Sequence, residues 1–244
     1  MLRRIERGEV EGGVVDGSVE DAKRGAKGAA DNVLSHLDPA KRAELLALLK
    51  PWWRPIPAGS FEMGSEQGDD DEKPVHRVTF TSDFQMLAVP VTWAMYRLFD
   101  PGHDAARAFF HGNRLSREAQ DEVPVYRVSW YAAVMFAEWV GARLPLEPEW
   151  EYSCRAGTKT RFWSGDTNEG LTRVGWHSDL GGGGNAQGHP HPVAQKPKNA
   201  WGLHDVHGNV WEWCADAWDS EAYAARTDGL TVDPRRATLS LIHI

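Results

Sequence analysis

The sequence contains very little cysteine: Cys154 and Cys214 are the two in 244 residues. Two cysteines do not make the disulfide framework of a small secreted domain. Neither lies in a Cys-x-x-Cys or Cys/His spacing that would hold zinc or exchange disulfides. We therefore expect two buried structural thiols. The alternative, a copper-binding or redox pair, requires the two sulfur atoms to meet in space.

Long hydrophobic runs and an excess of positive charge are also missing. No stretch approaches the roughly 20 apolar residues of a membrane span, and residues 1–10 lack the apolar run of a signal peptide. The formal net charge is −8, and the 27 Lys and Arg residues form no stripe that would neutralise a phosphate backbone. These absences predict a cytoplasmic protein whose partners include neither a membrane nor nucleic acid.

The residues that are abundant indicate a loop-rich globular chain. There are 24 Gly, 14 Pro and 12 Trp residues, which favour many turns and a few large aromatic anchors. Residues 1–28 have few large apolar groups, so we expect a disordered tail there. Residues 31–50 have helical spacing interrupted at Asp38-Pro39, which predicts a short helical hairpin. This hairpin packs either on the domain or on a partner further upstream.

The rest of the chain alternates short apolar runs with turn residues. Residues 75–80 and 84–89 are typical of strands in a small antiparallel sheet. Residues 92–99 and 129–140 are typical of helices, the first capped by Thr92 and the second by Ser129. After residue 163 we expect mostly loop.

An ordered series of short blocks covers residues 55 to 219. The blocks are Ile56–Ser65, Glu72–Val78, Pro90–Thr92, Pro124–Trp130, Arg143–Pro145, Glu149–Tyr152, Pro192–Val193 and Trp201–Trp213. In this order they resemble the formylglycine-generating-enzyme family, the sulfatase-modifying factors. The resemblance implies an α+β fold: an irregular, loop-rich body of the C-type-lectin-like kind with small antiparallel sheets and two or three helices.

The resemblance also sets the expected domain boundaries. Residues 1–54 form the tail and helical hairpin, and residues 55–238 form the formylglycine-generating-enzyme-like domain. Leu146 stands where the family usually has Thr, and Pro148 where it has Ala. Leu146 has no oxygen to accept the first amide hydrogens of a helix, at a cost of about 1 kcal/mol, whereas Pro148 is tolerated in a first helical turn.

One segment of the chain carries ligand chemistry. Asp205 and Glu212 are carboxylates seven residues apart around a Gly-Asn turn, and hard Ca²⁺ prefers carboxylate and carbonyl oxygens in such loops. The resemblance implies a structural calcium ion here, with Asp205 and Glu212 as side-chain ligands and Gly208 and Val210 contributing backbone carbonyls. In the alternative, both carboxylates only satisfy backbone amides of a buried loop.

Other polar groups are weaker candidates for metal binding. The family's second ion implies ligands within residues 175–188, where Asp179 and Asn185 are candidates. An iron site would need two histidines and a carboxylate on rigid supports. The histidines in question are expected to be solvated or locally hydrogen-bonded instead; they are His189, His191, His204 and His207.

Two further groups are expected to be structural. The acidic run at residues 69–72 is interpreted as a solvated loop face rather than a cation site. Trp201, Trp211, Trp213 and Trp218 are interpreted as core rather than as a surface on which a sugar or peptide stacks.

The resemblance also implies a reaction. Active family members use oxygen and a copper-bound cysteine pair to oxidise a cysteine of a protein substrate, such as a sulfatase, to formylglycine; thiolates suit soft Cu(I). In the family this pair follows an Arg-Gly-Gly-Ser strand downstream of the W-E-W block. The sequence lacks that strand, and Cys154 and Cys214 fall at other positions. We therefore expect no catalytic or copper-binding residue in this chain.

The last residues bear on the expected length of the protein. Residues 239–244 resemble the conceptual translation of a transposon end used in sequencing libraries, so we expect an artefact there and a longer natural protein. The full-length form is expected to generate formylglycine. The alternatives are a non-catalytic lectin-like binding module and an accessory domain of a larger signalling or defence protein.

Overall fold

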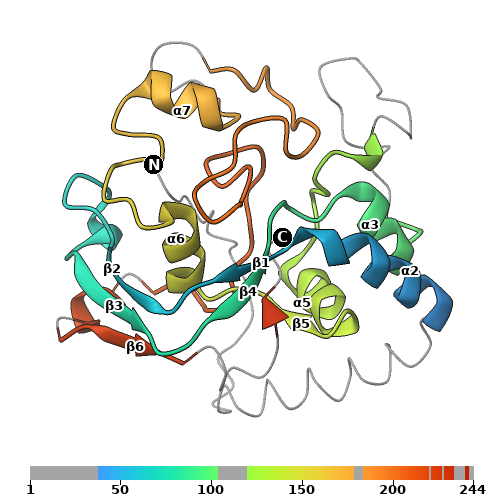
Figure 1. The fold of residues 1–244 in the computed structure, drawn as a ribbon, viewed down its shortest axis with the longest axis horizontal. Coiled ribbons are helices and arrows are strands. Elements are labelled where there is room, and N and C mark those ends of the chain that lie inside the picture. Colours follow the sequence, from blue (N-terminus) through green and yellow to red (C-terminus); the bar gives the residue numbers. More distant parts are fainter. Residues whose placement is uncertain are drawn as a thin grey trace, which may run out of the picture.

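The computed structural model describes residues 38–103, 120–178, 184–219, 221–226, 228–233 and 240–241. The described chain is a mixture of helices and small sheets joined by long irregular segments (Figure 1). The expected loop-rich mixed fold is therefore confirmed. The described part contains five α-helices, however, which is more than the two or three predicted. None of the described helices is long and apolar enough to cross a membrane.

The strands form three small sheets. Strand β1 (Trp53–Ile56) pairs antiparallel with β4 (Phe84–Leu87), and β2 (Gly59–Met63) pairs antiparallel with β3 (His76–Phe80). Strand β6 (Leu230–Val232) then adds to β3 in parallel, and β7 (Ser240–Leu241) pairs in parallel with β5 (Ala142–Arg143). The prediction of antiparallel sheets is wrong for these two pairs. Both added strands reach their partners by long connections, which parallel pairing requires.

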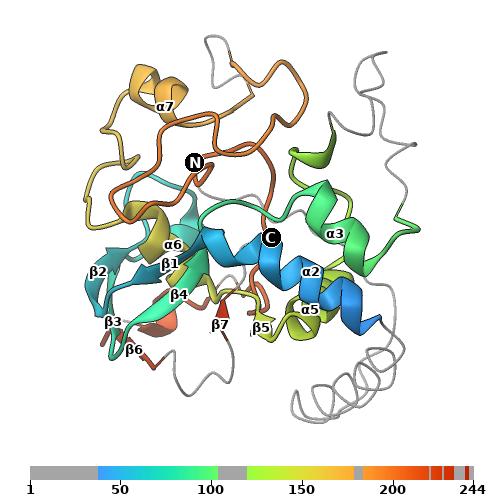
Figure 2. The same ribbon diagram turned by 45° about the vertical axis from the view of Figure 1, so that its right-hand side comes forward.

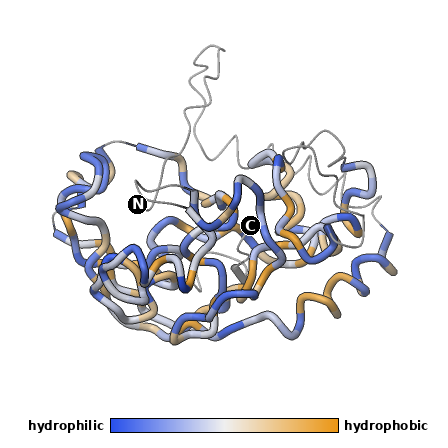
Figure 3. The backbone as a smooth tube through the Cα atoms, turned by 90° about the horizontal axis from the view of Figure 1, so that it is seen from above, coloured by the Kyte–Doolittle hydropathy of each residue, from blue (hydrophilic) through white to orange (hydrophobic). Residues whose placement is uncertain are grey.

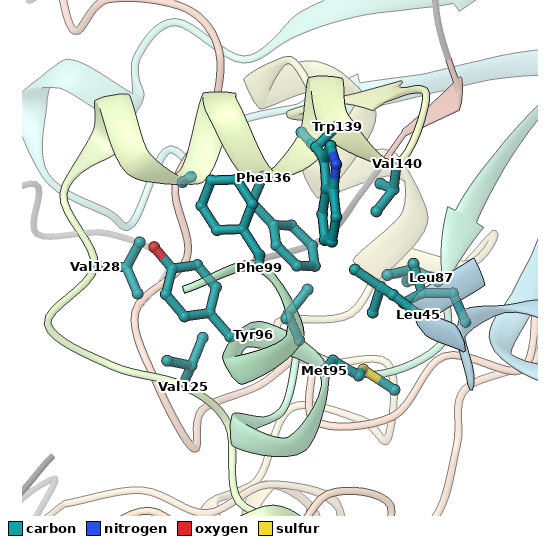
Figure 4. Packing of buried hydrophobic residues seen from close by; sticks show 14 of the residues in the cluster. Leu45, Leu87, Met95, Tyr96, Phe99, Val125, Val128, Phe136, Trp139 and Val140 are labelled. Carbon is teal, nitrogen blue, oxygen red and sulfur yellow. The ribbon is translucent and has the colours of Figure 1, made fainter. Parts of the chain in front are cut away.

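Three helices pack together on one side of the molecule (Figure 1). They are α2 (Pro39–Leu49), α3 (Trp93–Phe99) and α5 (Trp130–Trp139). Figure 4 shows Tyr96 and Phe99 of α3 facing Phe136 and Trp139 of α5. Such aromatic contacts add to the free energy gained from burying apolar surface.

Helix α2 begins where the sequence predicts. The Asp38 carboxylate accepts a hydrogen bond from the Ala40 amide at 2.8 Å, and Pro39 follows it as the first helical residue. Leu45 and Leu49 are fully buried, and α2 lies beside α3 (Figure 2). Hydrophobic and hydrophilic residues alternate along it (Figure 3). The helix therefore packs on the domain, whereas residues 31–37 of the predicted hairpin lie outside the described residues.

A second hydrophobic cluster lies between the sheets and helix α6 (Glu147–Arg155). Its rings include Tyr152, which stacks on Phe80 with centroids 4.6 Å apart. The loop residues Leu203 and Val206 are buried in the same cluster. This cluster therefore joins α6 to the segment that carries the predicted metal ligands.

The N-terminus of helix α6 is capped by a residue that is distant in sequence. Leu146 offers no acceptor, as expected, but its own amide donates to Glu149 Oε2 at 2.7 Å. The next amide, of Glu147, donates to the Asp216 carboxylate at 2.9 Å, across 69 residues of sequence. A carboxylate at this helix end also interacts favourably with the helix dipole. Asp216 thus supplies the capping interaction that Leu146 has lost.

Helix α7 (Asn168–Val174) was not predicted, because residues after 163 were expected to form loop. Its N-cap is Thr167, whose side-chain oxygen accepts a hydrogen bond from the Gly170 amide at 3.1 Å. The helix buries only Leu171 and Val174. A stripe of two apolar residues is too short to stand out from a loop in the sequence.

Candidate metal loop

Residues 205–212, here called the metal loop, lie along helix α6. The contacts begin at the start of the helix and continue through its middle to its last turn, while the loop runs in the opposite chain direction. The bonds join Glu147 N to the Asp216 carboxylate, Trp150 Nε1 to Glu212 Oε2, Cys154 Sγ to Val206 O, and Asn199 Nδ2 to Ser153 O. The bonds of Asn199 and Asp216 attach the segments on either side of the metal loop to this helix, and those of Val206 and Glu212 attach the two ends of the loop itself.

The turn within the metal loop requires its Gly-Asn pair. Gly208 has φ 135°, and a Cβ atom added there would lie 2.0 Å from the backbone oxygen of Trp176. Asn209 follows with φ 67°, a left-handed conformation that Asn tolerates better than most residues. Its amide donates to the same Trp176 oxygen at 2.8 Å. The close approach of two backbone segments thus explains this part of the motif.

Asp205 is buried, with 2% of its surface exposed. Its Oδ2 accepts a hydrogen bond from the Ala194 amide at 2.8 Å, whereas Oδ1 accepts from Asn209 Nδ2 at 3.5 Å, the limit of a hydrogen bond. Burial raises the pKa of the Asp205 carboxyl, although the Ala194 bond opposes this. Asp205 therefore satisfies one backbone amide and keeps acceptor capacity at Oδ1.

Glu212 is the second carboxyl of the loop. Its Oε2 accepts a hydrogen bond from Trp150 Nε1 at 2.5 Å. Burial raises the pKa of the Glu212 carboxyl well above its usual range; the Trp150 bond opposes this effect and the negative charge of Asp205 adds to it. The two carboxyls are thus close enough to repel each other. Protons or a cation would relieve that repulsion.

The donor set fits a hard cation. The predicted ligands are the carboxyls of Asp205, which is buried, and Glu212, which is half-buried, with the carbonyls of Gly208 and Val210. Carboxylate and carbonyl oxygens are the ligands that Ca²⁺ prefers. The Gly208 carbonyl also accepts the Val210 amide at 2.9 Å, which leaves it a second lone pair. Within the described residues no group of three or more His, Cys, Asp and Glu side chains is placed to hold a metal. A metal here would therefore depend on backbone oxygens.

The residues predicted to bind the second ion are Asp179 and Asn185. Asn185 Oδ1 accepts the His177 amide at 2.9 Å, and its Nδ2 donates to the carbonyls of Thr172 and Gly175. This side chain thus fastens the backbone of its own loop. Asp179 lies outside the described residues.

Three of the four histidines bond to nearby backbone oxygens. The carbonyl partners are Pro190 for His189, Ala186 for His191, and Lys196 for His204. The ring of His191 also stacks on Trp176, with centroids 3.8 Å apart, and its amide donates to Asn209 Oδ1. The expectation of local hydrogen bonding is confirmed for these three.

His207 is buried beside Cys154. Its Nε2 accepts the Trp163 amide at 2.9 Å, so its proton is on Nδ1, which lies 3.5 Å from Cys154 Sγ. Burial lowers the pKa of His207 to about 3. Sequence reasoning did not find this role, because Trp163 is 44 residues away.

The two cysteines are free thiols. Cys154 is buried and donates to the Val206 carbonyl at 3.2 Å, and burial raises the pKa of its thiol well above the usual value. A neutral thiol is a poor ligand for copper. Cys214 is half-buried, and its carbonyl accepts the Trp130 indole N–H. The predicted burial is confirmed for Cys154 and is wrong for Cys214.

Three of the four tryptophans predicted to lie in the core are exposed. Trp211 is 71% exposed, Trp218 47% and Trp213 40%. The Nε1 of Trp213 donates to the Val128 carbonyl, and the Nε1 of Trp218 donates to the Asp71 carboxylate. The prediction that these three residues form core is wrong, whereas Trp201 is half-buried against Tyr152.

The chain is similar in sequence to the proteins of one family. Residues 54–238 match the sulfatase-modifying factor enzyme 1-like domain. The chain belongs to this family. It is 40% identical over 121 residues to a formylglycine-generating enzyme of Thermomonospora curvata, covering 46% of this chain and 39% of that protein. It is 32% identical over 184 residues to the serine/threonine-protein kinase pkn1 of Chlamydia caviae, covering 69% of this chain and 28% of that protein.

Solved structures agree with the family assignment. PvdO from Pseudomonas aeruginosa superposes with a TM-score of 0.56 at 26% identity, covering 74% of this chain and 76% of that chain. The chain spans less than half the length of the Thermomonospora and Chlamydia relatives. The activities of those longer proteins are therefore only proposals for this chain.

Proposed function

We propose that this chain is a domain of the formylglycine-generating type that is stabilised by a bound calcium ion. Ca²⁺ is held by the side chains of Asp205 and Glu212 and by the carbonyls of Gly208 and Val210. The observation that carries this proposal is a loop with two carboxyls, buried Asp205 and half-buried Glu212, fastened to one helix; burial and then repulsion by Asp205 raise the pKa of Glu212. A divalent cation removes that repulsion and links the loop to the segments packed on it.

The proposed reaction of the complete protein is oxidation of a cysteine to formylglycine in a protein or peptide substrate such as a sulfatase. Support comes from the family and from the name of the Thermomonospora relative. Copper held by a pair of thiolates would supply the oxygen chemistry. Cys154 is buried and Cys214 half-buried, and neither stands at the family's catalytic positions, so we expect neither to belong to that pair.

The chain is therefore expected not to convert a cysteine peptide. It would be incubated with Cu(I), oxygen, a reductant and a peptide carrying a sulfatase-type cysteine, and the aldehyde would be measured by mass spectrometry. The Thermomonospora curvata formylglycine-generating enzyme is the positive control. Aldehyde above the protein-free background that disappears in Cys154→Ser or Cys214→Ser would contradict the proposal.

Calcium is expected to raise the melting temperature of the chelated protein. A ligand that binds only the folded state stabilises it by about 2.7 kcal/mol at a concentration 100 times its Kd. Asp205→Ala and Glu212→Gln should abolish the rise, whereas Asp69→Asn, which changes an exposed carboxylate, should leave it intact. The calcium site is refuted if the wild-type melting temperature does not move after chelation and re-addition.

A second candidate function is a non-catalytic binding module. Tyr131 and Trp211 are 72% and 71% exposed, and Trp213 bonds to Val128 just before the helix that carries Tyr131. Exposed aromatic rings are enriched at recognition surfaces. An accessory role in a larger protein fits the Chlamydia kinase, of which the match covers 28%.

A further inference from the structure

Helix α6 is attached to the rest of the domain through two of its residues, Glu149 and Glu151. Glu149 is fully buried and takes both arms of the Arg143 guanidinium, at 2.9 and 2.7 Å. Two residues later, Glu151 accepts from Arg155 Nε at 2.8 Å and from the Gly64 amide at 3.0 Å. The bidentate pair of Glu149 with Arg143 fixes the orientation of both partners. The backbone of α6 between Glu149 and Glu151 is thereby well fixed.

Trp150 lies between these two anchors and reaches the metal loop. Its indole Nε1–H donates to Glu212 Oε2 at 2.5 Å. An indole is a neutral group that only donates, so it orients a carboxylate without cancelling its charge. Lys or Arg at the same place would act as a competing cation. The Trp150 bond therefore orients the Glu212 carboxylate and leaves its negative charge available to a cation.

The other end of the loop is attached to the same helix. Cys154 Sγ–H donates to the Val206 carbonyl at 3.2 Å, one residue beyond Asp205. Trp150 and Cys154 are four residues apart and so lie on the same face of the helix. Helix α6 thus sets the separation between the two ends of the loop, one of which carries Asp205 and the other Glu212.

We infer that Trp150 is a positioning residue for the metal loop: its indole N–H holds Glu212 in the arrangement that receives a hard divalent cation. This inference rests on the proposed calcium site. Groups that orient a metal ligand through a hydrogen bond change metal affinity without touching the ion. Trp150 therefore sets calcium affinity from outside the ligand set.

The test replaces only the N–H group. A benzothienylalanine at position 150 keeps the shape of the bicyclic ring but has sulfur in place of the donor, and Trp150→Phe is a genetically simple companion. Calcium affinity would be measured by titration calorimetry on the chelated full chain. The expected result is about 10–100-fold weaker binding. The same isostere at Trp130, whose N–H bonds to the Cys214 carbonyl, is the matched control and should bind as the wild type does.

Each outcome decides a separate point. Wild-type affinity in the position-150 isostere overturns the inference, as does equal weakening at positions 130 and 150, which would indicate a general loss of stability. If Trp150→Phe fails to fold, the isostere still decides, because it preserves the volume of the ring. If the wild-type chain binds no calcium, the proposed calcium site itself fails.

Discussion

Replacing Glu149 by alanine is expected to lower the free energy of unfolding by about 3–5 kcal/mol. The substitution leaves the Arg143 guanidinium in a largely buried position without its bidentate carboxylate. It also removes the acceptor of the Leu146 amide at the start of α6. An uncompensated buried charge and an unsatisfied amide both destabilise the folded state. Urea unfolding followed by circular dichroism measures the loss.

The matched control is Glu62→Ala. Glu62 and Arg77 form a pair at 3.8 Å whose side chains are more than half exposed. Exposed pairs of this kind contribute less than about 1 kcal/mol. Equal losses in the two variants would show that the Glu149 pair is not the anchor of α6 described above.

Acidification is expected to destabilise the fold through His207. Burial lowers its pKa to about 3, from an ordinary 6.5. Between pH 6.5 and pH 3 the His207 imidazole is therefore protonated in the unfolded chain but neutral in the folded chain. Stability is unaffected above this pH and falls by about 1.4 kcal/mol per unit as the pH drops toward 3. At pH 4 the expected loss from this residue is about 3 kcal/mol.

Other groups titrate in the same range, so the measurement is a difference between two proteins. His207→Gln keeps an acceptor for the Trp163 amide but takes up no proton. Unfolding free energies of both proteins would be measured by urea titration from pH 7 to pH 4 in the presence of a chelator. The wild type should lose more stability than the variant. Parallel curves would mean that His207 is accessible to protons in the fold.

Helix starts were predictable because their signals are local. Thr92 accepts the Met95 amide at the start of α3, and Ser129 accepts the Ala132 amide at the start of α5. Each pair is three residues apart, so the sequence displays it directly. The cap of α6 was not predictable, because its acceptor, Asp216, comes from a distant segment. The parallel partners of β3 and β5 were missed for the same reason.

The contacts of the 205–212 segment were predictable only in part. The family pattern pointed to Asp205 and Glu212, and the Gly-Asn turn between them has a visible steric reason at Gly208. The pattern did not reveal Trp150 as the hydrogen-bond donor to Glu212, since 62 residues separate the two. The exposed position of Trp211 was missed because burial of a tryptophan depends on neighbours that the sequence does not identify.

The hydrophobic interior consists of two clusters, one among α2, α3 and α5 and one between the sheets and α6, and Trp52 touches both. Local opening in a protein tends to follow such contiguous units. The helical cluster can therefore loosen while the sheets and α6 keep the 205–212 segment in place. Damage to the first cluster is then expected to lower the melting temperature before it disturbs the 205–212 segment, and Trp52 is one residue that contacts both clusters.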